Sequence, residues 1–324
     1  MIHLFATRVG ARDTLHPYLR DWAGEMRPRL AVHLYEEALR WPPFGAGTFI
    51  FTDLERLNAY QMEVVRGLRD QLLAHHPHCR ILNDPREVLL RLPLLNALHA
   101  AGINDFNAYP VDQLPKTHRM PVFLRSAADH SGSRTPLLED QGSRDRALLG
   151  YVMSGLPVEQ AILVEFCDTR DSGGIYRKYA AFRFGGRIIP AHVIFSREWV
   201  AKDGEPFDAA QREEEEDYVH TNPHREALLD IFERGHIQYG RIDYSLLNGR
   251  IQVWEINTNP ILLKERAVYE EEAPQAIPLK ETLAVTIRDC LRALDDVEAI
   301  PDVPPLRPSF KIVLRPPGEP SRDR

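Results

Sequence analysis

The sequence contains few cysteines, no long apolar run and no excess of basic residues. Only three cysteines, Cys79, Cys167 and Cys290, occur among 324 residues, and they are too far apart for a disulfide framework or a zinc motif. This pattern favours a reducing, cytoplasmic compartment. No stretch is apolar enough to span a bilayer, and the first residues lack the core of a signal peptide, so we expect no membrane partner. The formal net charge of −7 argues against nucleic acid as a partner, because non-specific binding needs a basic surface.

Two common nucleotide-binding motifs are also missing. The sequence contains neither a P-loop nor Gly-x-Gly-x-x-Gly, so any nucleotide must be bound by a different arrangement of residues. Hydrophobic residues make up 44% of the chain and charged residues 27%, which is ordinary for a globular protein. With 324 residues, the chain is long enough for two or three domains.

The stretch from 240 to 260 combines a hairpin signal with carboxylate and amide side chains. It reads as two β-strands joined at the Asn-Gly pair of residues 248 and 249, which is a strong hairpin signal. Asp243, Glu255 and Asn257 carry the hard oxygen ligands that suit magnesium. A carboxylate in an apolar, buried strand is costly unless it is paired or bound to metal. The alternative is a surface hairpin whose polar residues face water.

The same stretch resembles the C-terminal metal-binding signature of the ATP-grasp superfamily. The match consists of Arg-Ile-Asp-Tyr, a short turn and Trp-Glu-Ile-Asn-Thr-Asn-Pro. This superfamily includes D-alanine–D-alanine ligase, glutathione synthetase and the ribosomal-protein glutamate ligases. The resemblance implies that Asp243, Glu255 and Asn257 bind Mg²⁺, or Mn²⁺ in its place, and that Arg241 is a catalytic residue that steadies the transferred phosphoryl group. One departure is Ile261, where many members have glycine after the proline.

Two arginines stand where the family usually has phosphate-binding lysines. An Asn-x-Pro sequence leads into a helix predicted to start at Asp84 and end at Gly102, and that helix offers Arg91. The strand over 120–125 ends in Arg125. By the resemblance both residues would contact ATP phosphates, although the planar guanidinium differs from a lysine point charge. For Arg91, the alternative is a solvated arginine on a helix.

The run from 160 to 168 looks like the family's hinge, where adenine contacts the backbone. The resemblance therefore suggests four cofactor-binding residues, which are Glu165, Phe166, Cys167 and Asp168. A buried apolar strand with one charged residue would look similar. Cys167 reads as a small hydrophobic residue rather than a nucleophile, because no partner base is evident.

By the same resemblance, a second hairpin would supply a further contact to phosphate or substrate, and a polar loop offers another candidate. The hairpin covers 175–195 and turns at a Gly-Gly pair. Arg177 and Lys178 point to opposite faces because side chains alternate along a strand, and we favour Arg177 as the cofactor contact. His130, in the loop over 126–142, is either a substrate contact or a plain surface histidine.

We expect an α/β and α+β protein with an N-terminal open α/β domain followed by a two-lobed ATP-grasp region with antiparallel sheets. Short apolar strands near 2–6, 48–52 and 79–82 alternate with helical patterns over 30–39 and 54–75. The expected domains are an N-terminal domain, a small lobe with a phosphate loop, a C-terminal lobe with the metal site and a proline-rich tail, over residues 1–105, 106–170, 171–298 and 299–324.

The resemblance implies a ligase that depends on ATP and magnesium and acts through an acyl phosphate. Its substrates would be a small-molecule or peptide carboxylate and an amine, or a thiol in place of the amine, and a homodimer is compatible with it. Two alternatives stay open at this point. One is an ATP-grasp kinase that phosphorylates a hydroxyl, and the other is a regulatory nucleotide-binding module weakened by its arginine-for-lysine replacements.

Strand alternation sets a geometric condition on the metal site. A strict two-residue turn would put Asp243 opposite Trp254, so that Glu255 faced the other side of the hairpin. A three-residue loop would instead set Asp243 opposite Val253 and Arg241 opposite Glu255, and all the polar residues would share one face. The ligase hypothesis therefore predicts a bulged turn or an equivalent one-residue slip.

Overall fold

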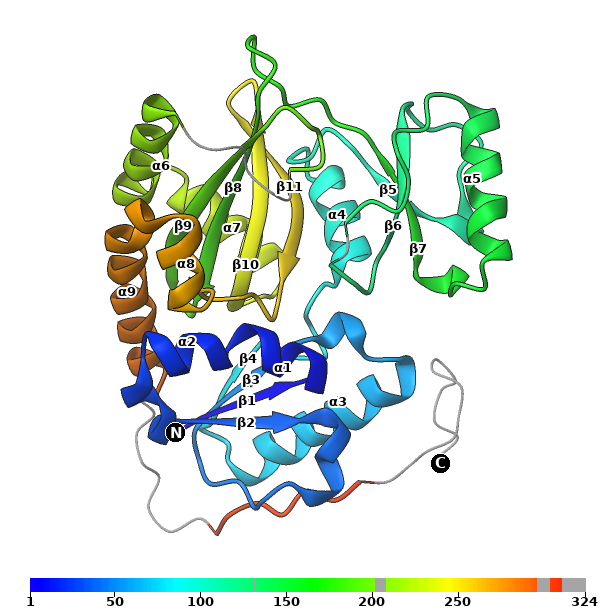
Figure 1. Cartoon of the computed structure of the whole chain (residues 1–324). Coiled ribbons are helices and arrows are strands. Elements are labelled where there is room, and N and C mark those ends of the chain that lie inside the picture. Colours follow the sequence, from blue (N-terminus) through cyan, green and yellow to red (C-terminus); the bar gives the residue numbers. More distant parts are fainter. Residues whose placement is uncertain (131, 202–207, 296–303, 311–324) are drawn as a thin grey trace, which may run out of the picture. The chain divides into compact units, whose positions relative to one another are not determined.

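The computed structural model describes residues 1–130, 132–201, 208–295 and 304–310, which form two compact units (Figure 1). Among the described residues, the first unit comprises Met1–Val88, His236–Tyr239 and those from Thr258 onward, and the second comprises those within Leu89–Gly235 and Gly240–Asn257. Both units are therefore built from segments that are separate in the sequence. No helix within the described ranges is long and apolar enough to cross a membrane.

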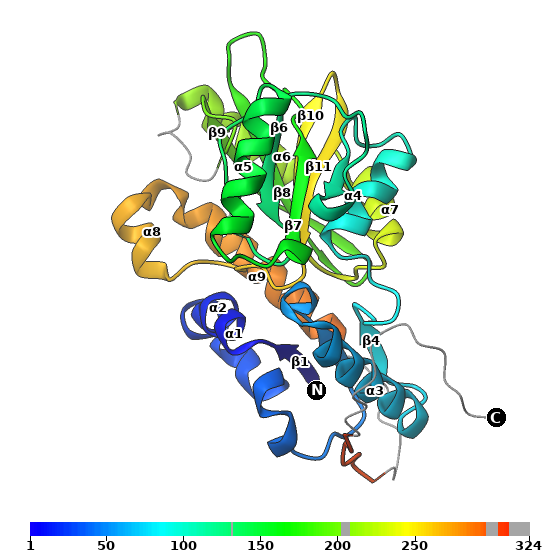
Figure 2. The same ribbon diagram turned by 90° about the vertical axis from the view of Figure 1, so that its right-hand side faces the viewer.

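The first unit contains a parallel four-stranded sheet in the order β2-β1-β3-β4, which confirms the expected open α/β arrangement. Its strands are β1 (Ile2–Ala6), β2 (Leu30–Leu34), β3 (Thr48–Phe51) and β4 (Arg80–Leu82). Every residue of β1 and β3 is buried, as expected for parallel strands covered on both faces. The covering helices are α1 (Arg8–Thr14) and α2 (His16–Asp21) on one face and α3 (Ala59–His75) on the other (Figure 2).

Two further α-helices of the first unit come from the end of the chain. They are α8 (Arg266–Glu272) and α9 (Ile277–Asp295). The Tyr18 hydroxyl of α2 donates to the Ala284 carbonyl of α9 at 2.9 Å, which joins the two helices. The short 3₁₀ helices of this unit are Gly24–Arg29, Tyr35–Arg40, Leu54–Arg56 and Pro274–Ala276.

The second unit contains two antiparallel arrangements of strands. One sheet has the order β11-β10-β8-β9 and the other the order β5-β7-β6. The strands of the first are β8 (Tyr176–Phe184), β9 (Arg187–Ser196), β10 (Tyr239–Leu247) and β11 (Arg250–Asn257). Those of the second are β5 (Ala108–Pro110), β6 (Val122–Ser126) and β7 (Ala161–Glu165). Both hairpins that the sequence predicts are therefore present, with β8 pairing with β9 and β10 with β11.

Helices of the second unit pack on both sheets (Figure 1). Helices α6 (Ala209–Thr221) and α7 (Arg225–Arg234) lie against β9, and α5 (Gln141–Met153) lies against β6. Helix α4 (Arg91–Ala100) contacts both β5 and β11, and so places its first residue beside the hairpin of β10 and β11. The unit also has two short 3₁₀ helices: Val158–Gln160 directly precedes β7 in the sequence, and Val111–Gln113 contacts β7.

Two helices predicted from the sequence differ in the structure. Residues 30–39 do not form one α-helix. Leu30–Leu34 forms strand β2 in parallel register with β1, because this long-range pairing overrides the local helical spacing, and Tyr35–Arg40 forms a short 3₁₀ helix. The helix expected from Asp84 begins only at Arg91. Asp84 instead forms an ion pair with Arg69 of α3, and Leu90 is extended just before the helix.

Most of the expected proline-rich tail, 299–303 and 311–324, lies outside the described residues. Within the described part of the tail, Leu306 is buried and pairs with Phe44 through backbone hydrogen bonds of 2.7 and 2.8 Å. This part of the tail is therefore attached to the first unit.

The register of the β10–β11 hairpin contains a one-residue slip, as the metal-site condition requires. Leu247 pairs with Arg250, so the turn itself is a regular two-residue turn with positive φ at both central residues. The register shifts between Asp243, which pairs with Glu255, and Tyr244, which pairs with Val253, so Trp254 is the extra, bulged residue. A one-residue slip is present as predicted, but it lies at Trp254 and not at the turn. It also shifts the register in the opposite direction, so the predicted pairs are wrong: Asp243 lies opposite Glu255 and not Val253, and Arg241 lies opposite Asn257 and not Glu255.

Candidate functional site

Four polar residues share one face of the β10–β11 hairpin. Asp243 lies opposite Glu255, and Arg241 lies opposite Asn257. Residues directly opposite in an antiparallel pair project from the same face of the sheet. Together they line a cavity of about 420 Å³ within the second unit. Its other lining residues are Phe123, Arg125, His130, Gly132, Ser133, Phe166, Cys167, Thr169, Tyr176, Lys178, Trp199, Val200, Ala201, Ser245 and Trp254.

Glu255 is held by two arginines from other elements. The Nη2 atoms of Arg91, at the start of α4, and of Arg125, in β6, both donate to the same oxygen, Oε2, at 2.6 Å each. Burial alone would raise the pKa of Glu255, but the positive charges of Arg91 and Arg125 lower it well below the ordinary value. Glu255 is therefore a carboxylate at neutral pH.

Asp243 has its own pair of cations. Arg241 donates to Asp243 through Nε at 2.9 Å and through Nη2 at 3.4 Å, and Lys178 Nζ lies 3.7 Å from Asp243 Oδ2. Counting Arg91 and Arg125, four cationic side chains thus surround two carboxylates. This excess of positive charge favours a polyanionic ligand.

The donor chemistry of Asp243, Glu255 and Asn257 fits magnesium. Two carboxylates and one amide supply only hard oxygen ligands, and Mg²⁺ usually takes one or two protein carboxylates together with phosphate oxygens. In the part of the chain that the structure describes, no group of three or more His, Cys, Asp and Glu residues could hold a metal ion. Any metal bound here therefore needs the Asn257 amide or the ligand itself to complete its coordination.

One wall of the cavity is aromatic and apolar. The rings of Phe123 and Trp199 lie 4.9 Å apart between centroids, and the rings of Phe166 and Trp199 lie 5.8 Å apart at nearly right angles. Cys167 also lines the cavity, and its burial raises the pKa of the thiol to about 11. The thiol is therefore protonated at neutral pH, which agrees with its reading as a small hydrophobic residue.

Two of the four expected hinge residues face away from this cavity. The Glu165 carboxylate accepts hydrogen bonds from the backbone N–H groups of Asn107 and Arg119 and from the Tyr109 hydroxyl, at 2.9 to 3.1 Å. Asp168 forms an ion pair with Arg170 and lines a neighbouring cavity of about 680 Å³. Phe166 and Cys167, which follow the end of β7, are the two hinge residues that line the polar cavity.

On β8 the basic residue that reaches the cavity is Lys178 and not Arg177, contrary to expectation. Arg177 donates to Glu214 at 2.8 Å and also pairs with Asp171, outside the cavity lining. Strand alternation placed the two side chains on opposite faces, but only the neighbouring strand β10, with Asp243, decides which face is the cavity.

His130 lies in the site and is not a plain surface histidine. Its Nδ1 atom is 3.2 Å from Arg91 Nη2 and 3.9 Å from Glu255 Oε1. Arg91 also donates to the backbone carbonyls of Ser126 and Asp129, at 2.7 and 2.5 Å. One arginine thus connects the loop after β6 to the Glu255 carboxylate.

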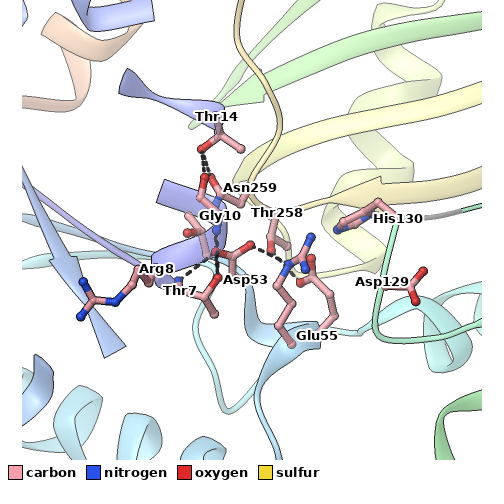
Figure 3. Close-up of polar contacts among 12 residues, drawn as sticks. Thr7, Arg8, Gly10, Thr14, Asp53, Glu55, Asp129, His130, Thr258 and Asn259 are labelled. Atoms are coloured by element: carbon pink, nitrogen blue, oxygen red, sulfur yellow. Dashed lines mark hydrogen bonds and ion pairs between the residues drawn. The ribbon is translucent and has the colours of Figure 1, made fainter. Parts of the chain in front are cut away.

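The first unit has a separate buried polar network, which the sequence analysis did not identify (Figure 3). Asp53, two residues after β3, accepts from the backbone N–H and the hydroxyl of Thr7, directly after β1, and from Asn259 Nδ2, at 2.8 to 2.9 Å. Asn259 in turn accepts from the Thr14 hydroxyl at 2.9 Å. Burial and nearby Glu55 raise the pKa of Asp53. Polar residues one or two positions after buried parallel strands are the signal that could have revealed it.

Comparison with solved structures bears on the fold. The D-alanine–D-alanine ligase of Bacillus anthracis complexed with ATP is similar with a TM-score of 0.50 and 12% identity, over 90% of this chain and 98% of that chain. The chain shares the fold of this ligase. A RimK domain ATP-grasp protein of Sphaerobacter thermophilus (TM-score 0.43, 17% identity) matches 90% of this chain and 99% of its own. The D-alanine–D-alanine ligase of Helicobacter pylori (TM-score 0.46, 12% identity) matches 94% and 99%. Neither a protein-family model nor a curated protein sequence matches the chain.

The two arginines that stand where lysines were expected share one partner. Both reach Glu255, the residue that the signature assigns to metal binding. Aromatic residues such as Trp199, in the segment after β9, were missed because a single tryptophan in a connecting segment carries no periodic pattern.

Proposed function

We propose that the protein is an ATP- and magnesium-dependent ligase that joins a carboxylate to an amine, or to a thiol, through an acyl phosphate. The observation that carries this proposal is the shared face of Arg241, Asp243, Glu255 and Asn257 over a cavity that also contains Lys178. Phosphoryl transfer depends mainly on positioning and on neutralising charge, and this set of side chains supplies both.

The cavity offers a site for phosphate oxygens. Arg125 lines it, and the buried Arg125 Nε has no hydrogen-bond partner among the described residues. A buried donor without an acceptor costs roughly 1–3 kcal/mol, so a phosphate oxygen there would relieve that cost. Lys178 and Arg241 supply further positive charge beside Asp243.

In this proposal, the metal ion and the purine ring of ATP bind at different parts of the cavity. Asp243, Glu255 and Asn257 would hold magnesium, which when bound neutralises charge on the phosphate oxygens. The apolar wall formed by Phe166 and Trp199 suits the flat face of a purine. Arg241, which is paired with Asp243, is the residue we assign to the transferred phosphoryl group.

The proposed reaction has two steps. An oxygen of the substrate carboxylate attacks the γ-phosphorus of ATP, an O–P bond forms, and the bond from phosphorus to the ADP oxygen breaks. The amine nitrogen then attacks the acyl carbon, a C–N bond forms, and inorganic phosphate leaves while the amine loses a proton. In both steps the cationic side chains stabilise negative charge that develops on phosphate oxygens.

Trapping of the acyl phosphate tests this proposal. The full chain is incubated with ATP, Mg²⁺, hydroxylamine and a panel of carboxylates, and ADP and hydroxamate are measured. We expect at least one carboxylate to give ADP and hydroxamate in equal amounts. Phosphorylation of a hydroxyl without hydroxamate would indicate a kinase, and ATP binding with no ADP across the panel would indicate a regulatory module. Either result would refute the ligase.

A further inference from the structure

Glu255 is engaged by two cations at the position where a metal ion would need it. Arg91 Nη2 and Arg125 Nη2 both lie 2.6 Å from the same oxygen of Glu255. The exposed fractions of the three side chains are only 4%, 11% and 15% for Arg91, Arg125 and Glu255. Charges this buried are screened little by salt, so the three groups interact strongly in the absence of any ligand. A divalent cation approaching Glu255 would meet two positive charges.

The two arginines are held differently. Arg91 also donates to the backbone carbonyls of Ser126 and Asp129, so it is fixed by the loop after β6. Arg125 lines the cavity, and its Nε is buried without a hydrogen-bond partner among the described residues. Moving Arg125 toward a phosphate group would satisfy this donor and replace one anionic partner with another. Arg125 is therefore the arginine that an anion in the cavity can draw away from Glu255.

We propose that Arg91 and Arg125 prevent metal ions from binding Glu255 until a polyphosphate draws Arg125 away, so that metal binding requires nucleotide. This inference rests on the proposed function, because it assigns Glu255 to the metal site. Coupling between two ligands is reciprocal, so bound metal also strengthens the binding of nucleotide. The coupling is built from an ion pair between side chains of α4, β6 and β11 and needs no change of fold.

Titration with Mn²⁺ in the absence of nucleotide tests the inference. The free Mn²⁺ signal in electron paramagnetic resonance reports binding to the full chain without any turnover. We expect the wild type to bind weakly and Arg125→Gln to bind about tenfold more tightly or better, since typical coupling energies correspond to roughly 5- to 150-fold. Arg170→Gln is the matched control, because Arg170 is an exposed arginine paired with Asp168 and should leave Mn²⁺ affinity unchanged.

A double variant shows whether the gained affinity belongs to this site. Adding Glu255→Gln to Arg125→Gln should return Mn²⁺ binding to the wild-type level or below. If Arg125→Gln does not fold by circular dichroism, Arg91→Gln removes the other cation and should shift the affinity in the same direction. Wild-type binding as tight as that of Arg125→Gln, or tight binding that survives the double substitution, would overturn the inference. The hydroxamate assay is independent of both results, so a failure of the ligase proposal is recognised separately.

Discussion

Asp243 lies directly opposite Glu255 in the β10–β11 ladder, although the hairpin ends in a regular two-residue turn. The bulge at Trp254 makes this pairing, because the extra residue shifts Glu255 onto the face of Asp243. The Trp254 ring stacks on Phe106 with centroids 5.1 Å apart, and its Nε1 donates to Ser245 Oγ at 2.9 Å. The bulged residue is thus anchored by its own side chain.

Replacing Glu255 by glutamine should abolish magnesium-dependent ATP turnover while the chain still folds. The amide lacks the charge that a metal ligand needs, and we expect a loss of about 100-fold or more, the scale seen when a preorganised charged or polar group is removed from an active site. The two buried arginines would lose their anion, so unfolding in urea should show a loss of roughly 1–3 kcal/mol. Glu226→Gln, at a residue that is 79% exposed, is the control. Undiminished turnover in Glu255→Gln would contradict the assignment of Glu255 to a metal site.

Lys178→Met should lower kcat/KM for ATP, whereas Arg177→Met should not. Lys178 lies 3.7 Å from Asp243 inside the cavity, while Arg177 is paired with Glu214 and Asp171 outside it. Loss of one cation from a phosphate site should cost about tenfold or more in kcat/KM. The two neighbouring positions form a matched pair. Equal effects, or a larger effect at Arg177, would contradict the placement of Lys178 in the site.

Gly10→Ala should destabilise the first unit. An added Cβ would lie 2.0 Å from Asp53 Oδ2 and 2.4 Å from Asn259 Nδ2, so the buried network would have to move. We expect a loss of roughly 1–3 kcal/mol in the free energy of unfolding, the usual cost of overpacking. Gly67→Ala is the control, since Gly67 also lies in a helix and its Cβ would meet nothing within 4 Å. There alanine should stabilise the protein by about 0.5–1 kcal/mol, and a stable Gly10→Ala would show that the network tolerates displacement.

Stability should fall on acidification because two buried histidines stay neutral in the folded state. His3 and His33 are 3.0 Å apart between ring nitrogens, and burial lowers their pKa values to about 3 and about 4. Unfolded histidine has a pKa near 6.5, so the unfolded chain binds more protons below that pH. The stabilisation is complete above about pH 6.5 and is lost progressively toward pH 4. By pH 5 the loss is on the order of 2 kcal/mol for each residue.

Urea unfolding at pH 7.5 and pH 5 measures this dependence. The double substitution His3→Phe, His33→Phe removes both titrating rings and both hydrogen-bonding partners, and should flatten the pH dependence. His78→Gln, at an exposed residue, should leave it as in the wild type. A double variant that loses as much stability as the wild type between the two pH values would assign the acid sensitivity to other groups.

The sequence by itself determined the local elements and the chemistry of the site. The Asn-Gly turn, the apolar strands β1 and β3, and the oxygen-bearing side chains of Asp243, Glu255 and Asn257 are encoded within short stretches, where turn preference and side-chain type suffice. Only the tertiary structure decided which of these groups meet. Strand β2, the bulge at Trp254 and the cavity position of Lys178 depend on pairing with distant strands.

The same limit applies to the contacts of the arginines. Position in the sequence indicated that Arg91 and Arg125 belong to the site, yet their common bond to Glu255 joins residues 164 and 130 positions apart. Local patterns carry no information on such a contact, because its geometry follows from the packing of α4 and β6 against the hairpin. The sequence therefore determined which groups this protein has available, and the tertiary structure determined which charges neutralise one another.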